Sequence, residues 1–443
     1  MTNRDMFVRS TAVVWHPCTQ MKHHERLPLV PIQRGQGVWL YDFNGKRYLD
    51  AVSSWWVNLF GHCNPRINAA ISDQLGKLEH VMLAGFTHEP VVQLSERLTQ
   101  LAPAGLNHCF YASDGASAVE VSLKMSAHYW RNCGQSDKTD FVSLHNSYHG
   151  ETLGALSVTD MPLFKNAYSA LIKQNATIPS PDTRLAQAGE SAHDYALRCA
   201  EVLEQHLQQH HHTIAAFIVE PLVQGAAGMA MYHPVFLERA RALCDQYAVH
   251  LIADEIAVGM GRTGTLFACE QAQVRPDFLC LSKGLSGGYL PLSVVLTSEK
   301  IYQAFYTEET TRGFLHSHSY TGNPLACRAA LATLEIFEQD DVVAVNREKA
   351  GYFNNLLQPI RDHAKVKNFR NTGMIWAFEV DSPAPDFAQR CFQLALEREI
   401  LLRPIANTVY FMPPYTINEM EMEMLSTGTL AIVELFATAE SAR

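Results

Sequence analysis

The stretches HLIADEIAVGMGRTG, residues 250–264, and FLCLSKGLSGG, residues 278–288, decide the fold. Each begins with a short apolar run of the kind that forms a strand buried on both faces. The first run ends at Asp254, and the second is followed by Lys283 before a glycine-rich loop. A charged side chain at the end of a buried strand is costly unless it is paired or used in chemistry. The two stretches therefore predict neighbouring strands of one sheet with a functional site at their carboxyl ends.

The middle of the chain repeats this pattern, since short apolar runs alternate with stretches of helical periodicity. Such alternation predicts an α/β domain with a largely parallel sheet. The expected strands are His108–Ala112, Phe141–Leu144, Ala215–Val219, His250–Ala253 and Phe278–Leu281, and the expected helices are Ala116–Trp130, Tyr195–His210 and Pro234–Tyr247.

The two ends of the chain differ from the middle. Gly37–Asp50 predicts a hairpin, because Asn44 and Gly45 are the residues that a tight two-residue turn prefers. Residues from Val366 to Ala437 alternate strand-like and helical segments. We therefore expect a large domain over residues 61–335 and a smaller α+β domain built from residues 1–60 and 336–443, since 443 residues exceed one compact core.

Composition excludes several classes of function. A net charge of -10 and the absence of a basic run argue against nucleic acid as a partner. The charged N-terminus MTNRDMFVRS does not fit a signal peptide, and no window has the apolar length of a membrane span. The ten cysteines are scattered, which predicts reduced thiols in a cytoplasmic protein. The run His210–His212 lies in a polar stretch without metal-ligand spacing, so no metal is expected.

Lys283 and Asp254 together indicate a specific chemistry. A desolvated lysine amine has a lowered pKa and becomes the nucleophile that forms a Schiff base, although an ion-paired structural lysine is equally consistent with its sequence context alone. A carboxylate such as Asp254 can keep the pyridine nitrogen of pyridoxal 5'-phosphate protonated, so that the ring accepts electrons. Because the two residues follow successive strands, we expect both at the same sheet edge.

Two further stretches extend this site. In SDGASAVEVSLKMSAHYW, residues 113–130, a strand ends, Gly115 makes a turn and a helix begins. The amides of a helix N-terminus bind anions, which suits a phosphate. In NSYHGET, residues 146–152, Tyr148 follows a strand and is a candidate to stack on a cofactor ring, with a core tyrosine as the alternative.

These elements, in this order, resemble the class III (ω-type) aminotransferases of PLP fold type I over nearly the whole chain. The most specific stretches are DEIAVGMGRTG (254–264), SKGLSGG (282–288) and HSHSYTGNPLA (316–326). The resemblance implies that Lys283 is the Schiff-base lysine and that Asp254 pairs with the pyridinium nitrogen. It also implies that Gly115 and Ala116 hold the phosphate through backbone amides and that Tyr148 lies against cofactor and substrate.

The resemblance further implies a homodimer with shared active sites. His318 and Ser319 are expected at the cofactor phosphate, with Ser319 supplied by the neighbouring subunit. Trp55 and Arg403 are expected to line the substrate pocket, and Ser317 falls where the family has a substrate-contacting backbone. Apolar neighbours in LLRPI predict that Arg403 is buried, and in an extended segment only one of Trp55 and Trp56 would face the pocket.

Within the family, four stretches are similar to the members that act in biotin biosynthesis: WHPCTQM (15–21), AVSSWW (51–56), YHPVFLERAR (232–241) and LLRPIANTVYFMPPY (401–415). This implies adenosylmethionine as the amino donor and 8-amino-7-oxononanoate as the acceptor. Three positions depart from relatives. Ala116 replaces a Ser or Thr, Cys18 replaces a substrate-contacting tyrosine, and His318-Ser319 replaces Pro-Thr.

Three other functions remain compatible with the sequence. One is an ω-amino acid:pyruvate or diamine aminotransferase, which has the same core motifs. Another is a biotin-pathway enzyme that uses lysine as donor. The third is a catalytically silent cofactor-binding or scaffolding protein, which the presence of both Lys283 and Asp254 disfavours.

Overall fold

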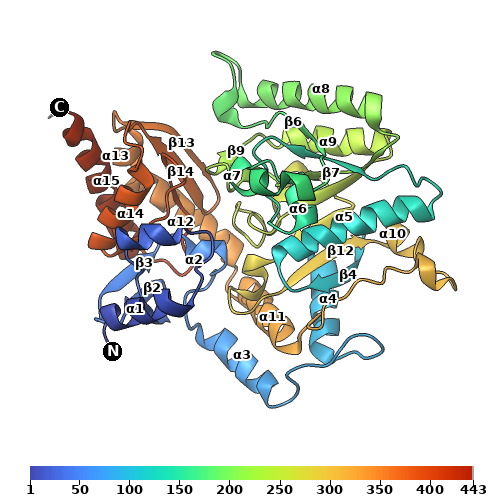
Figure 1. Ribbon diagram of the computed structural model, residues 1–443, viewed down its shortest axis with the longest axis horizontal. Coiled ribbons are helices and arrows are strands. Elements are labelled where there is room, and N and C mark those ends of the chain that lie inside the picture. The colour runs from blue at the N-terminus through green and yellow to red at the C-terminus, as the bar shows by residue number, and fades with distance from the viewer. Residues whose placement is uncertain (442–443) are drawn as a thin grey trace. The chain divides into compact units, whose positions relative to one another are not determined.

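A computed structural model describes residues 1–441 of the chain. The chain divides into two compact units. Unit 1 combines Met1–Pro65 with the chain from Asn346 onward, and unit 2 is Arg66–Val345 (Figure 1). The division falls at 65/66 and 345/346 rather than at the expected 60/61 and 335/336. The expected second boundary would cut helix α11 (Pro324–Gln339), which packs on α4 (Glu89–Leu101) of unit 2.

Unit 2 is built on a seven-stranded sheet with the order β4-β12-β11-β10-β7-β5-β6. The pairs β11/β10, β10/β7, β7/β5 and β5/β6 are parallel, whereas β12 runs antiparallel to both β11 and β4. The strands are β4 (Leu106–Ala112), β5 (Asp140–Leu144), β6 (Ala176–Ile178), β7 (Ile214–Val219), β10 (His250–Asp254), β11 (Phe278–Leu281) and β12 (Ser293–Ser298). This mainly parallel α/β sheet confirms the fold class expected from the sequence.

Helices cover both faces of this sheet, as the alternation of side chains shows. Ala216 and Ile218 of β7 join the apolar core beneath α5 (Gly115–Asn132). Phe217 lies between them in sequence and points to the other face. There its ring packs edge-on against that of Phe236 in α9 (Val235–Gln246), with 6.2 Å between the ring centroids. Every residue of β7 is buried, which is the pattern of a strand between two helical layers.

The remaining elements of unit 2 are one long helix and several short helices and strands. Helix α8 (Ala192–His210) packs on α9, and both are labelled in Figure 1. The others are α3 (Pro65–Leu75), α6 (Leu153–Val158), α7 (Pro162–Lys165), α10 (Glu299–Gln303) and the two-residue strands β8 (Val223–Gln224) and β9 (Ala230–Met231). The expected strands and helices of the middle region are all present, with ends that differ by only a few residues.

Unit 1 contains a four-stranded sheet in the order β1-β2-β3-β15 and a three-stranded sheet in the order β13-β14-β16. The expected hairpin is confirmed, because β2 and β3 pair antiparallel with Tyr41 opposite Arg47. The elements are α1 (Asn3–Val13), β1 (Ile32–Gln36), β2 (Trp39–Asp42), β3 (Arg47–Asp50), α2 (Ser53–Trp56), α12 (Val342–Leu356), α13 (Gln358–Arg361), β13 (Val366–Thr372), β14 (Ile375–Val380), α14 (Phe387–Glu397), β15 (Ile400–Leu401), β16 (Thr408–Phe411) and α15 (Glu419–Ser441).

Among the residues that the structure describes, none of the helices combines the length and the apolar character needed to cross a membrane.

The core of unit 2 contains a histidine that makes folding sensitive to acid. His250 is buried, its Nδ1 lies 2.9 Å from Ser126 Oγ, and its ring stacks on Trp130 at 4.6 Å. Burial lowers the pKa of His250 to about 4, with the positive charges of Arg241, Lys300 and Lys138 adding to the shift and Asp277 opposing it. The unfolded chain therefore binds a proton near pH 6.5, while the folded chain does so only near pH 4.

We expect this histidine to contribute stability that is complete above about pH 6.5 and is lost as the pH falls toward 4. The loss should be on the order of 2–3 kcal/mol at about pH 4.5. Urea denaturation of the wild type and of His250→Asn, each at about pH 7 and about pH 4.5, measures it. The wild type should lose more stability than the variant between the two conditions, and an identical loss in both proteins would contradict the assignment.

Candidate active site

The carboxyl edge of the unit 2 sheet gathers the residues expected to carry the chemistry. Because β5, β7, β10 and β11 are parallel, their carboxyl ends meet at one edge. Strand β4 also ends there, since it is antiparallel to β12, which is antiparallel to β11. Ligands in such sheets bind beyond this edge. The topology thus places Asp254, Lys283, Tyr148 and the start of α5 on the same side of unit 2.

Asp254 is held in a defined orientation within this edge. It is buried at the end of β10, where Oδ1 accepts a hydrogen bond from Ile256 N at 3.1 Å. Its Oδ2 lies 2.7 Å from His149 Nδ1, and His149 is also buried. A carboxylate only accepts hydrogen bonds when ionised, so this pairing assigns the proton of His149 to Nδ1. Among the described residues, none forms a hydrogen bond with the buried His149 Nε2.

Lys283 begins a short 3-10 turn, Lys283–Ser286, directly after β11 and Ser282. Its backbone has a φ of 43°, a left-handed conformation that non-glycine residues rarely adopt and that concentrates at functional sites. Burial lowers the pKa of Lys283, while the negative charges of Asp254 and Glu220 act in the opposite direction. The amine is thus easier to deprotonate than an exposed lysine. The two carboxylates partly offset this effect, because they favour its charged form.

Glu220 is a second buried carboxylate at this edge, directly after β7. Its Oε2 accepts from Tyr148 N at 3.0 Å and its Oε1 accepts from Gly225 N at 3.0 Å. Burial raises the pKa of Glu220 to about 7; the charge of Asp254 raises it further, and His149 opposes the shift. Glu220 therefore holds the loop that carries Tyr148 and His149 at this edge of the sheet.

The N-terminus of α5 is the position predicted for the anion site, a role that stays a prediction. Asp114 caps the helix, since Asp114 Oδ1 accepts from Ser117 N at 2.9 Å. The first amides of a helix have no acceptor inside the helix and are available to an anion. A side chain on Gly115 would approach Ile256 Cγ2 to 3.0 Å, and one on Gly150 would approach Ala116 Cβ to 2.6 Å. Because these glycines have no side chains, Ile256 can pack against Gly115 and Ala116 can pack against Gly150.

Tyr148 is partly buried, with its hydroxyl 2.9 Å from Glu151 Oε1 and its ring 5.5 Å from that of Phe164. Near the start of α5, His318 Nδ1 lies 3.0 Å from Ser113 Oγ. Ser317 and Ser319, on either side of His318, are exposed in the single chain. The roles of all four residues stay predictions.

In unit 1, Trp55 and Trp56 lie in different environments, but the extended backbone expected for this segment was wrong. The segment is not extended: Ser53, Ser54, Trp55 and Trp56 all have positive φ angles of 47–73° and form a left-handed turn, α2. Trp56 is buried and donates from Nε1 to Tyr410 Oη at 3.1 Å. Trp55 is 43% exposed.

Arg403 contacts the exposed tryptophan. Its guanidinium carbon lies 4.6 Å from the centre of the Trp55 ring, a cation–π arrangement. The expectation that Arg403 is buried was wrong, because the residue is exposed in the single chain. The apolar neighbours Leu402 and Ile405 turn inward instead, with Leu402 fully buried.

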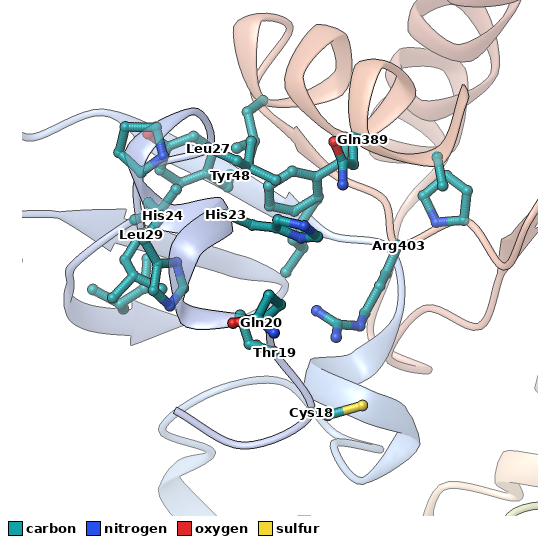
Figure 2. Close-up of a pocket in the computed structure, with 18 of the residues that line it drawn as sticks. Cys18, Thr19, Gln20, His23, His24, Leu27, Leu29, Tyr48, Gln389 and Arg403 are labelled. Carbon is teal, nitrogen blue, oxygen red and sulfur yellow. The ribbon is translucent and has the colours of Figure 1, made fainter. Parts of the chain in front are cut away.

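Arg403 also lines a cavity of about 490 Å³ within unit 1. The walls are mainly apolar and include Leu27, Leu29, Phe392 and Leu396, with Cys18, Gln20, His23 and Gln389 as polar members. Figure 2 shows His23, Gln20 and Arg403 pointing toward a common space. Among the described residues that line the cavity none is acidic, so its character is apolar and electropositive. Both expected substrate residues of this region, Cys18 and Arg403, therefore share one cavity, and Trp55 adjoins it through Arg403.

Sequence reasoning missed two residues of the unit 2 site. Glu220 follows an expected strand, as Asp254 does, so the same strand-end reasoning applies to it. His149 is adjacent to Tyr148, but only the fold brings it to Asp254. Among the described residues, no group of three or more His, Cys, Asp or Glu side chains is arranged to hold a metal ion.

Comparison with known proteins identifies the family. The model of the class-III aminotransferases matches residues 20–432. The adenosylmethionine-8-amino-7-oxononanoate aminotransferase of Helicobacter pylori is 46% identical over 429 residues, which cover 95% of this chain and 96% of that protein. The protein of the same name from Aquifex aeolicus is 39% identical, with 95% of each chain covered.

Solved structures give the same result. The crystal structure of adenosylmethionine-8-amino-7-oxononanoate aminotransferase from Methanocaldococcus jannaschii superposes with a TM-score of 0.92 at 34% identity and covers 98% of this chain and 99% of that chain. The ω-transaminase of Pseudomonas jessenii in complex with PMP has a TM-score of 0.93 at 28% identity, covering 98% of both chains. With the strand-end lysine and carboxylate in place, this chain belongs to the class III aminotransferases.

Proposed function

We propose that this aminotransferase moves an amino group from S-adenosyl-L-methionine to 8-amino-7-oxononanoate, giving the 7,8-diaminononanoate of biotin biosynthesis. The observation that carries the chemistry is the meeting of Lys283 and Asp254 at one sheet edge, with a helix N-terminus beside them. The choice of substrates is supported by the names of the relatives, which match this chain over nearly its full length. The electropositive cavity of unit 1 adds a site suited to a carboxylate.

The residues of unit 2 fit pyridoxal 5'-phosphate as cofactor. Lys283 offers an amine for its aldehyde, Asp254 an ionised acceptor for its ring nitrogen, and the amides of Gly115 and Ala116 a site for its phosphate. The glycine at 115 leaves this phosphate turn without a side chain, and Ala116 lacks a hydroxyl, so phosphate contacts at these positions come from the backbone. When bound, the cofactor supplies an electron sink for the carbon that carries the amino group.

The residues of this chain then perform the remaining tasks. The lowered pKa of Lys283 increases the fraction of neutral amine. Its Nζ can then accept a proton from the substrate carbon and deliver it to the cofactor carbon. Asp254 holds a negative charge toward the ring nitrogen, and His149 fixes the orientation of that carboxylate through its Nδ1 hydrogen bond. Tyr148 offers an aromatic face beside this edge.

Arg403 is proposed to bind the carboxylate that both substrates carry. A guanidinium presents a planar pair of donors that match a carboxylate, and the cavity has no acidic residue to compete for it. Trp55 would hold the guanidinium in place through the observed ring contact and offers a face to the sulfonium of adenosylmethionine. Cys18, smaller than a tyrosine, leaves the cavity wider at this point.

We further propose a homodimer with shared active sites in the cytoplasm. The exposed Ser317 and Ser319 suit a role in the site of a neighbouring subunit, where Ser319 would donate to phosphate beside His318. All ten cysteines are free, as expected in a reducing compartment.

The test is a half-reaction with purified holoenzyme and one amine at a time. Adenosylmethionine alone should convert the visible absorbance of the bound cofactor to that of its amino form, and adding 8-amino-7-oxononanoate should reverse the change. Conversion by lysine but not by adenosylmethionine would reassign the donor. Conversion only by ω-amino acids or diamines, with pyruvate as the acceptor, would favour the alternative class III activity.

A further inference from the structure

The left-handed turn Ser53–Trp56 is an unusual structure for its sequence. Four consecutive non-glycine residues have φ angles of 51°, 47°, 73° and 73°. The turn is hydrogen-bonded like a helix, since Trp56 N donates to Val52 O at 2.9 Å and Val57 N to Ser53 O at 3.0 Å. Side chains of L-residues crowd the backbone in a left-handed helix, so such a turn persists only where its surroundings enforce it.

Asp50 is the principal residue that enforces it. Its side chain is completely buried just before the turn. Asp50 Oδ1 accepts from Ser54 N at 2.9 Å, and Oδ2 accepts from Ser54 Oγ at 2.7 Å. The carboxylate therefore holds both the backbone and the side chain of the turn's second residue. The carboxylate that accepts both bonds is buried, although Ser54 itself is exposed.

His62 completes the arrangement from the other side. Its Nε2 lies 3.0 Å from Asp50 Oδ2, and its Nδ1 lies 3.1 Å from Asn58 Nδ2. These partners assign the proton to Nε2, which donates to the carboxylate, while Nδ1 accepts from the amide. Backbone hydrogen bonds between His62 and Gly37 fix the position of the histidine in turn.

The turn ends in the two tryptophans. Trp56 is anchored in the core, and Trp55 is exposed at the surface of the single chain. Ser53 Oγ donates to Met412 O at 2.7 Å, and Trp56 is anchored at Tyr410. The left-handed backbone between these anchors points Trp55 outward, where its ring meets Arg403. A relaxed backbone between the same anchors would turn the Trp55 ring elsewhere.

We infer that Asp50 and His62 form a clamp that positions Trp55 against Arg403, so that the clamp sets the affinity for carboxylate substrates without touching them. Asp50 is thus a positioning residue of the substrate pocket. This inference rests on the proposed function for the roles of Trp55 and Arg403, but the geometry of the clamp is independent of it.

The first arm of the test compares steady-state kinetics of Asp50→Asn with those of the wild type. The isosteric amide weakens both bonds to Ser54 and the bond from His62, so KM for the carboxylate substrates should rise about tenfold while kcat stays within about twofold. Asp182→Asn is the control, since Asp182 is also buried but lies in unit 2, where its Oδ2 pairs with Arg184 Nη2 at 2.6 Å. Its KM should be unchanged.

The second arm separates backbone strain from the lost hydroxyl. Ser54→Ala and Ser54→Gly both remove the hydrogen bond from Ser54 Oγ to Asp50 Oδ2. Position 54 is exposed, so neither change is expected to prevent folding. Only glycine adopts the left-handed conformation without a steric penalty. We expect Ser54→Ala to raise KM about threefold and Ser54→Gly to raise it less. Adding Ser54→Gly to Asp50→Asn should recover part of the affinity.

The outcomes distinguish the clamp from the proposed function. If Arg403→Ala and Trp55→Ala raise KM but Asp50→Asn does not, the clamp is overturned and the substrate site survives. If neither Arg403→Ala nor Trp55→Ala raises KM, the proposed site falls, and the clamp loses its role in affinity. A crystal structure of Asp50→Asn decides the geometry regardless of activity: the turn should leave the left-handed region at residues 54 and 55, and an unchanged turn would refute the clamp.

Discussion

Lys283→Ala should reduce transamination at least about 10³-fold, because the amine that attacks the cofactor and then moves the proton is removed in one change. No other lysine is expected to substitute for it, since Lys283 alone follows a strand end beside Asp254 and Glu220 in the described unit 2 sheet. Borohydride reduction followed by mass analysis gives a second measurement. It should attach the cofactor to the wild type at Lys283 and leave the variant unlabelled.

Lys138→Met is the matched control for this experiment. Lys138 is buried, whereas Lys283 is partly buried, and Lys138 precedes β5 and so lies at the opposite, amino edge of the sheet. Its Nζ donates to the carbonyl oxygens of His211, Ile214 and Ala248 at 2.6–3.1 Å. The control variant should lose stability while retaining cofactor attachment and turnover. Turnover at background level in both the wild type and Lys283→Ala would restore the silent-scaffold interpretation, whereas full turnover in Lys283→Ala would remove the lysine from the mechanism.

Asp254→Asn should lower kcat about 10²- to 10³-fold, as the removal of a preorganised electrostatic partner does in other enzymes. The amide keeps the size of the side chain but cannot hold a negative charge toward the ring nitrogen. Its NH₂ group can also face the protonated Nδ1 of His149, which disturbs the 2.7 Å contact. A shift in the pH dependence of the visible absorbance of the bound cofactor measures the lost charge independently of turnover.

Glu255→Gln provides the control for Asp254→Asn, since the two carboxylates are adjacent and both are buried. Glu255 accepts from Ala268 N and Cys269 N at 2.7 and 2.8 Å, and burial raises its pKa to about 7. A neutral isostere there should change stability modestly and leave the absorbance of the cofactor unchanged. If both variants lose activity equally, the effect of Asp254 comes from packing rather than from its charge.

Much of unit 2 could be predicted from the sequence because its signals are local. An apolar run such as Phe278–Leu281 forms a strand whatever its neighbours, and the strand that it predicts has the same ends in the structure. The end of a parallel strand also defines a site edge, which is why Lys283 and Asp254 could be singled out before any geometry was known. The choice of Arg403 followed from resemblance, but its exposure did not, since burial depends on how Leu402 and Ile405 pack.

Contacts between distant segments could not be predicted in the same way. The pair His149–Asp254 joins residues 105 positions apart, and the contact between Arg403 and Trp55 joins opposite ends of the chain. The backbone of Ser53–Trp56 could not be predicted either, because residues such as Ser and Trp favour an extended segment over a left-handed turn. In the clamp that we propose, the buried carboxylate of Asp50 and its partner His62 stabilise that conformation.

The sequence by itself determined the strands, the order of the motifs and the family, and it singled out Lys283 and Asp254 as the predicted cofactor lysine and its carboxylate partner. It could do so because hydrophobic periodicity and strand-end charges are properties of short segments. The tertiary structure alone decided which tryptophan is presented, what orients Asp254 and where the electropositive cavity lies. Those features depend on side chains that are brought together by folding, and their free energies arise only once water has been excluded from between them.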